Sequence, residues 1–124
     1  MTNERKRILL IDNNELHLLS AEKMLKNEYN IFIAKSGKEA MDYFIRGLFP
    51  DIVLLDIVMP QIDGWETFNR IRAMSFLKDV PILFLKSLND SSEKKRAVEM
   101  GLAEYISKPY KKDDLKNRIK KYLE

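Results

Sequence analysis

Apolar runs of strand length alternate along the chain with segments of helical periodicity. We interpret five of these runs as strands, at residues 7–12, 30–34, 51–56, 81–86 and 103–107. Three of the runs contain four consecutive apolar residues, which extend from Ile8 to Ile11, from Ile52 to Leu55 and from Ile82 to Leu85. Uninterrupted apolar runs are typical of strands that are covered on both faces, as in parallel sheets.

The segments between the strands repeat apolar residues at helical spacing. Four such sets predict helices with one buried face: Leu18, Ala21 and Leu25; Ala40, Phe44 and Leu48; Trp65, Phe68 and Ile71; and Leu115, Ile119 and Tyr122. Ser36 with Glu39, and Asp90 with Glu93, predict capping boxes at the starts of the second and fourth helices. The alternation predicts five βα units, whose right-handed crossovers place helices on both sides of an open parallel sheet.

The composition indicates a globular protein with one core. The 124 residues are 45% hydrophobic and 33% charged, which is the balance of a soluble domain. No stretch approaches the roughly 20 apolar residues that span a bilayer, and the N-terminus has no signal-peptide pattern. The absence of cysteine excludes disulfides and thiolate metal sites. We therefore expect a cytoplasmic protein with no membrane partner.

The net charge of +3 is mild, and basic residues are interleaved with acidic ones on the predicted helices. This mixture is typical of solvated helical faces with ion pairs four residues apart. No recognition-helix motif or aromatic and basic surface is visible, so we expect no direct binding of nucleic acid.

Polar residues follow several of the predicted strands. In open parallel sheets, ligands bind outside the carboxyl ends of the strands. The residues at those ends are Asp12, Asn13, Asp56, Lys86, Ser87 and Lys108. If their strands are neighbours, two carboxylates and two ammonium groups converge on one edge of the sheet.

Four segments carry a resemblance to a known family. In their order and spacing, "ILLIDNN", "PDIVLLDIVMPQIDGWE", "PILFLKS" and "YISKPY" resemble the receiver domain of two-component response regulators. The resemblance covers the whole chain. It implies a flavodoxin-like (βα)₅ fold, a three-layer α/β sandwich whose parallel sheet has the strand order 2-1-3-4-5. Because the last predicted helix reaches the chain end, we expect a single receiver domain over residues 1–124 with no output domain.

The resemblance implies a phosphorylation site. Asp56 matches the family's phosphoacceptor, whose carboxylate attacks phosphoryl donors and becomes an acyl phosphate. Two anions must approach each other in this reaction, so a cation is needed on the phosphoryl oxygens. In the family that cation is Mg²⁺ together with a lysine, and Mg²⁺ prefers hard oxygen ligands. The matching metal positions are Asp12, Asn13, the Asp56 carboxylate and the backbone carbonyl of Val58.

Two further residues match family positions, one in the fifth strand and one directly after it. Lys108 matches the lysine that pairs with the phosphoacceptor, here Asp56, and the Lys108–Pro109 peptide is typically cis in the family. Tyr105 matches the aromatic switch residue that moves between exposed and buried positions. The alternative for Tyr105 is an ordinary surface aromatic, whose ring packs on the protein while its hydroxyl is solvated.

The sequence departs from the family pattern at two positions. Asn13 stands where the family usually has a second acid, and it offers a neutral oxygen to a metal. Lys86 stands where the family has a threonine or serine, whose hydroxyl binds the phosphoryl group. Ser87 follows it, but a shift of one residue would turn the core face of the strand outward. The turn "DNN" also contains Asn14, a good capping residue for the first helix.

Counting charges gives an interpretation of Lys86. The carboxylates of Asp12 and Asp56 are matched by the ammonium groups of Lys108 and Lys86, so the pocket is neutral before a metal binds. Like charges about 4 Å apart repel by about 4 kcal/mol at an effective dielectric near 20. We therefore expect Mg²⁺ to bind weakly or not at all, with Lys86 as its partial substitute. The alternative is that Lys86 extends into solvent.

We expect a signalling receiver that is phosphorylated on Asp56 and switches a protein-interaction face. Its expected partners are a sensor histidine kinase or phosphotransfer protein and a target on the helix 4–strand 5–helix 5 face, and it is a monomer or weak homodimer. Apart from self-catalysed phosphoryl transfer, it is not an enzyme.

Two alternatives remain at this point. One is a phosphorylation-independent pseudo-receiver that serves as a docking module. The other is a flavin- or nucleotide-binding protein, which the topology allows although no glycine-rich phosphate loop follows the first strand. The only histidine, His17, is expected in the first helix, away from any base–nucleophile pair.

Overall fold

The computed structural model describes residues 5–56, 64–86, 99 and 104–123. In these residues the strands are β1 (Arg7–Ile11), β2 (Asn30–Ala34), β3 (Ile52–Asp56), β4 (Ile82–Lys86) and β5 (Glu104–Ser107). The boundaries agree with the five predicted runs to within one residue. Apolar runs therefore identified the strands that form the centre of the fold.

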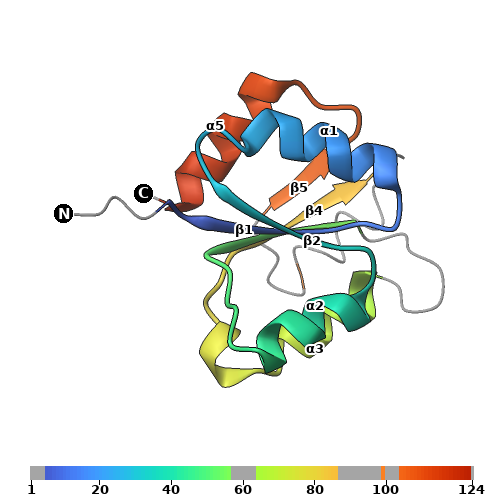
Figure 1. Ribbon diagram of the computed structural model, residues 1–124, viewed down its shortest axis with the longest axis vertical. Helices are drawn as coiled ribbons and strands as arrows, with labels where there is room; N and C mark the ends of the chain where they lie inside the picture. The colour runs from blue at the N-terminus through green and yellow to red at the C-terminus, as the bar shows by residue number, and fades with distance from the viewer. Residues whose placement is uncertain (1–4, 57–63, 87–98, 100–103, 124) are drawn as a thin grey trace.

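The five strands are all parallel and have the order β2-β1-β3-β4-β5. The helices of the described part are α1 (Glu15–Leu25), α2 (Gly37–Ile45), α3 (Gly64–Arg72) and α5 (Lys112–Leu123), and a short 3₁₀ helix, η1, spans Ser75–Leu77. Figure 1 shows α1 and α5 on one side of the sheet and α2 and α3 on the other. The three-layer arrangement and the strand order are confirmed. The predicted fourth helix, with Asp90 and Glu93, falls largely outside the described residues.

The sheet divides the core into two apolar layers. In β1, Leu9 and Ile11 pack with the α2 and α3 side, together with Phe84 of β4. Ile8 and Leu10 pack with the α1 and α5 side. Successive side chains of a strand point to opposite faces. Each four-residue apolar run thus supplies two residues to each layer.

The start of α2 follows the predicted cap only in part. The Ser36 hydroxyl accepts a hydrogen bond from the Glu39 backbone N–H at 3.1 Å. The Glu39 carboxylate, however, accepts from the N–H of Lys35 at 2.8 Å, where a capping box would have the N–H of Ser36. The helix end still gains two hydrogen bonds, because both side chains satisfy backbone donors that have no partner within the helix.

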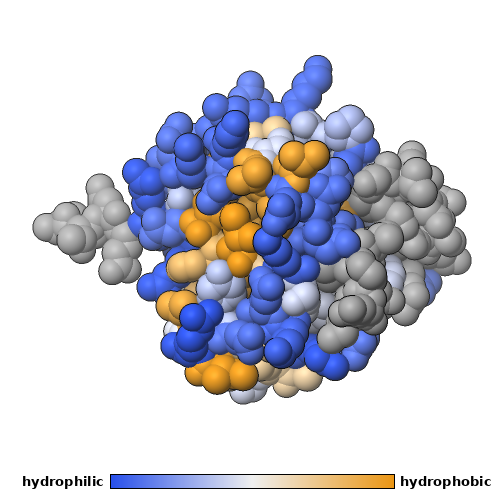
Figure 2. All heavy atoms as spheres, turned by 45° about the vertical axis from the view of Figure 1, so that its right-hand side comes forward, coloured by the Kyte–Doolittle hydropathy of each residue, from blue (hydrophilic) through white to orange (hydrophobic). Residues whose placement is uncertain are grey.

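The surface of the molecule is largely hydrophilic. Figure 2 shows apolar residues gathered in the middle and at the lower edge of one face, among mostly hydrophilic ones. The large apolar side chains that are most exposed in the described part are Leu16, Leu19, Ile45, Phe49 and Phe76. Within the described ranges, no helix combines the length and the apolar character needed to span a bilayer.

Candidate functional site

The strand register brings the predicted site residues to one edge of the sheet. Ile11 of β1 pairs with Leu55 of β3, so the residues that follow them, Asp12 and Asp56, lie at the same level. At the end of the next pair of strands, Lys86 pairs with Ser107, and Lys108 follows directly. The carboxyl edge of a parallel sheet is where ligands bind in such folds.

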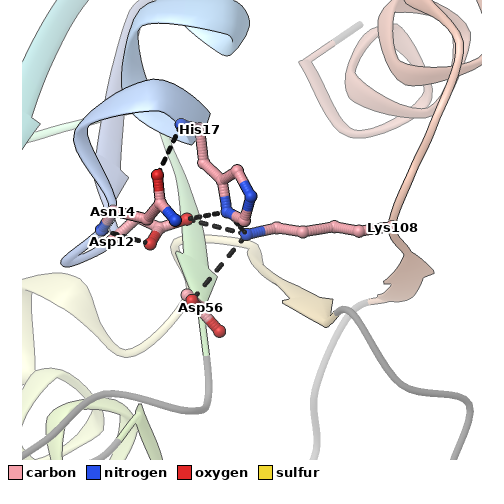
Figure 3. Close-up of polar contacts among 5 residues, drawn as sticks. All are labelled: Asp12, Asn14, His17, Asp56 and Lys108. Carbon is pink, nitrogen blue, oxygen red and sulfur yellow. Dashed lines mark hydrogen bonds and ion pairs between the residues drawn. The ribbon is translucent and has the colours of Figure 1, made fainter.

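The ammonium group of Lys108 lies between two buried carboxylates. Its Nζ is 2.7 Å from Oδ2 of Asp12 and 3.7 Å from Oδ2 of Asp56. The exposed fractions of the three side chains are 8% for Lys108, 6% for Asp12 and 12% for Asp56. Figure 3 shows the extended lysine reaching both acids. The ion pair with Asp56 that the resemblance implied is present, and a shorter contact, a hydrogen bond, joins Lys108 to Asp12.

Local hydrogen bonds hold Asp12 in this position. Its Oδ1 accepts from the backbone N–H of Asn14 at 2.9 Å, which leaves Oδ2 directed at Lys108. The Asn14 side chain in turn caps α1 by accepting from the backbone N–H of His17 at 3.1 Å. The expectation that Asn14 serves as a cap beside Asp12 is confirmed. Both acceptors are short polar side chains, which suit a strand-to-helix turn.

His17 belongs to the site, which was not anticipated from the sequence, because this residue was considered only as a partner in a base–nucleophile pair. Its ring Nδ1 is 2.8 Å from Nζ of Lys108 and 3.6 Å from Oδ2 of Asp12. The physical reason is the cap at Asn14, which fixes His17 in the first turn of α1. The spacing from Asn14 to His17 in "NNELH" is the signal from which this could have been found.

Two other expectations concern β5 and the peptide bond that follows it. The Lys108–Pro109 peptide is cis, as expected. Tyr105 of β5 is half-buried and packs against the core layer on the α2 and α3 side. It lies opposite Phe84 in the register of β4 and β5. Tyr105 therefore takes neither of the two extreme positions that the family's switch residue adopts.

Several predicted site residues fall outside the described part. Val58 and Ser87 are among them, and so is the side chain of Lys86, although its backbone ends β4. Asn13 is described and is exposed. Within the described part, the carboxylates of Asp12 and Asp56 face a single ammonium group, and this arrangement carries one excess negative charge.

The donor set has the chemistry that suits Mg²⁺. Asp12 and Asp56 present hard, buried carboxylate oxygens to one shared cation, and Mg²⁺ is usually bound by one or two carboxylates plus waters. Among the described residues, no group of three or more acidic or histidine side chains could hold a metal. Asp12 and Asp56 are the two described carboxylates that could hold such an ion.

A tyrosine lies near Asp12, one of the two acids. Tyr110 lines a small space together with Asp12, His17 and Leu18. Burial raises the pKa of Tyr110 to about 12, and the negative charge of Asp12 adds to the effect. The phenol therefore stays largely protonated up to about pH 12.

The raised pKa predicts a loss of stability in alkali. Between pH 10.0, the usual pKa of tyrosine, and about pH 12, the unfolded state releases a proton that the folded state keeps at Tyr110. The free energy of unfolding should therefore be unaffected by this group below pH 10.0 and fall as pH rises toward 12. Chemical denaturation at a series of pH values measures this slope. Tyr110→Phe should reduce it, and an unchanged slope would contradict the assignment.

The open parallel sheet, with two acids and a lysine at its carboxyl edge, defines a flavodoxin-like α/β domain. The response regulator receiver domain family matches residues 8–120, and the chain belongs to this family of two-component signalling modules.

Individual relatives agree with this assignment. The transcriptional regulatory protein CrdR of Helicobacter pylori (strain ATCC 700392 / 26695) is 33% identical over 120 residues, which cover 96% of this chain and 55% of CrdR. A CheY-like receiver domain protein from Methanospirillum hungatei JF-1 is 26% identical, with a TM-score of 0.86 over 97% of this chain and 94% of that one. This chain thus spans about half the length of CrdR.

A third relative is informative about the metal. The receiver domain of sensor histidine kinase PA1611 from Pseudomonas aeruginosa PAO1 is 25% identical, with a TM-score of 0.86 over 96% of this chain and 98% of that one. That structure has a magnesium ion coordinated in its active site cleft.

Proposed function

We propose that this chain is a receiver that accepts a phosphoryl group on Asp56 and thereby switches a protein-interaction face. The observation that carries the proposal is the buried Asp56 carboxylate at the carboxyl edge of the sheet, with the Lys108 ammonium 3.7 Å away. An anionic nucleophile can meet an anionic phosphoryl donor only beside positive charge. Lys108 supplies that charge from within the domain.

The reaction is a transfer of the phosphoryl group from a phosphohistidine or a small phosphodonor. A carboxylate oxygen of Asp56 forms a bond to phosphorus while the bond from phosphorus to the donor atom breaks. The donor atom keeps the electron pair of that bond and takes up a proton. The product at Asp56 is an acyl phosphate, whose extra negative charge attracts the ammonium group of Lys108.

Asp12 and Asp56 are the residues that would hold Mg²⁺, together with Asn13 and the carbonyl of Val58 as proposed ligands. Bound Mg²⁺ supplies positive charge to the phosphoryl oxygens. We infer that it binds weakly, because Asn13 brings no charge and because Lys108 and Lys86 add two positive charges to the pocket. Lys86 then serves as a partial replacement for the metal, with Ser87 beside it.

The proposed output face includes β5 and α5. A hollow of about 420 Å³ lies there, and its lining includes Tyr105, Ser107, Asp114 and Arg118. Movement of Tyr105 would alter this hollow directly. Such a change signals only if phosphorylation stabilises one arrangement of the face more than the other. The target is a downstream protein, and the domain is proposed to be a monomer or weak homodimer.

The phosphoryl donor is proposed to be a sensor histidine kinase or a phosphotransfer protein. Leu16 and Leu19 of α1 are 76% and 51% exposed, and α1 begins directly after the Asp12 turn. Apolar side chains beside the pocket support the docking of another protein, since exposed apolar patches often mark interfaces.

Treatment with a small phosphodonor and Mg²⁺ tests the proposal. The intact protein should gain the mass of one phosphoryl group, and Asp56→Asn should gain none because the amide is a poor nucleophile. Intact mass spectrometry makes the measurement, and circular dichroism of Asp56→Asn controls for folding. A mass gain that persists in Asp56→Asn would place the modification on another residue.

The alternative is a pseudo-receiver that acts without phosphorylation. One observation favours it: Lys108 already hydrogen-bonds Asp12 and His17, so its charge is engaged before any ligand arrives. In this case the wild-type protein would gain no mass with the phosphodonor, and calorimetry would detect no binding of Mg²⁺.

A further inference from the structure

We propose that His17 is a positioning residue that holds the Lys108 ammonium beside Asp12, beyond hydrogen-bond range of Asp56, until Asp56 is phosphorylated. This inference rests on the proposed function of Asp56. It explains why the Lys108 ammonium, the one ammonium group described in the pocket, lies where it does before phosphorylation.

Three acceptors surround Nζ of Lys108 at unequal distances. Oδ2 of Asp12 at 2.7 Å and Nδ1 of His17 at 2.8 Å are within hydrogen-bond range, whereas Oδ2 of Asp56 at 3.7 Å is beyond it. Figure 3 shows the imidazole ring on the Asp12 side of the amine. Two of the three ammonium protons are therefore directed at the β1–α1 turn.

Elementary chemistry decides which group donates the hydrogen bond between Lys108 and His17. A lysine ammonium group has three donors and no acceptor, so Nδ1 of His17 must accept the hydrogen bond. The neutral ring then carries its proton on Nε2. A lysine at hydrogen-bond distance thus selects one of the two tautomers of the histidine.

The helix cap and the packing of α1 together fix the position of the His17 ring. The backbone N–H of His17 donates to the Asn14 side chain, and α1 is anchored to the sheet by the buried residues Leu18 and Ala21. The His17 side chain is 41% exposed, with its Nδ1 turned into the pocket. The ring can therefore hold Lys108 without any change in the fold of α1.

The contact has a consequence for phosphorylation. A phosphoryl group on Asp56 offers new anionic oxygens, and the amine must move toward them and give up the bond to His17. The bond stabilises the resting state alone, so it opposes the phosphorylated state. Removing the acceptor should make the pocket bind a phosphoryl mimic more tightly.

The resting contact can be tested without any phosphoryl chemistry. Nitrogen NMR of the His17 ring at a pH where the ring is neutral should show the tautomer with the proton on Nε2. Lys108→Met should shift the Nδ1 resonance, because the donor is gone. A ring with its proton on Nδ1, or an Nδ1 resonance that does not respond to Lys108→Met, would overturn the contact.

The effect on the pocket is tested with beryllofluoride, a phosphoryl mimic, in the presence of Mg²⁺. His17→Leu should bind it about fivefold more tightly than the wild type, in keeping with the loss of one charged hydrogen bond at a partly exposed site. His17→Asn places an amide oxygen near the position of Nδ1 and should restore binding to within about twofold of the wild type. Ser20→Ala, on the next turn of α1, is the matched control and should behave as the wild type. Fluorine NMR of the bound fluoride gives the affinities.

The outcomes separate this inference from the proposed function. Equal affinity of the wild type and His17→Leu, or weaker binding by His17→Leu, would overturn the role of His17 while leaving Asp56 as the phosphoacceptor. If beryllofluoride binds to none of the proteins, the proposed phosphorylation of Asp56 fails. The proposed movement of Lys108 from His17 toward the phosphoryl group then fails with it. The nitrogen NMR result then still supports or overturns the resting contact between His17 and Lys108.

Discussion

Replacing Lys108 by methionine should lower the free energy of unfolding at neutral pH by about 3 kcal/mol. The change keeps most of the apolar stem but removes the charge from a side chain that is 8% exposed. Two buried carboxylates, Asp12 and Asp56, would then face each other without the cation that they share in this structure. Buried charges without a partner are among the few causes of large losses of stability.

Chemical denaturation measures the change, and two further variants make the result specific. Adding Asp12→Asn to Lys108→Met should recover part of the stability, because only one of the two neighbouring carboxylates then remains. Lys35→Met removes a lysine from an exposed ion pair with Glu15 and should change the free energy of unfolding far less. If Lys108→Met and Lys35→Met were equally mild, the ammonium group would not be a structural partner of the two acids.

Replacing Lys86 by threonine should strengthen the binding of Mg²⁺ by at least about tenfold, which corresponds to about 1.4 kcal/mol. The change removes one of the two positive charges that we place in the pocket and introduces the hydroxyl that the family usually has there. Two charges about 4 Å apart interact by about 4 kcal/mol at an effective dielectric near 20. Partial relief of this repulsion is enough for the expected gain.

Isothermal titration calorimetry with Mg²⁺ measures this gain. Lys38→Thr is the matched control, because it makes the same change of charge at an exposed position of α2. An equal gain in Lys38→Thr would mean that only the net charge of the protein matters. Unchanged binding in Lys86→Thr would support the alternative in which Lys86 extends into solvent.

The fold was predictable from the sequence because its strands are apolar for four residues in a row. Such runs are typical of strands that are covered on both faces. Ile52 to Leu55, for example, lie in β3, which is buried along its whole length. The strand order came from the resemblance to a family, since periodicity carries no information on which strands are neighbours. Element boundaries were correct to within one residue because charged or small residues bound each run.

Three of the predicted site residues lie together as expected, but their network of contacts was not predictable. Asp12, Asp56 and Lys108 each follow a strand, so their convergence required only the topology. That Lys108 would lie nearer to Asp12 than to Asp56 depends on the hydrogen bond from Asn14 to Asp12, which strand patterns do not reveal. His17 was missed because its contact arises from a helix cap and not from a strand end.

We propose that the charge balance of the pocket distinguishes this receiver from the usual family pattern. In the described part, one ammonium group is shared between two buried acids, and we infer that Lys86 adds a second. A pocket that carries its own cations needs less help from a metal when a phosphoryl group arrives. This property is separable from the question of whether Asp56 is the phosphoacceptor.

The most direct test compares phosphorylation of the wild-type protein by a small phosphodonor in excess Mg²⁺ and in excess chelator. The charge balance predicts that a phosphoryl group is still added to Asp56 in chelator, more slowly than with Mg²⁺ but clearly above the level in Asp56→Asn. Intact mass spectrometry over time records both reactions. Full phosphorylation in Mg²⁺ with none in chelator would contradict this charge balance. The metal alone would then supply the charge that we assign to the lysines.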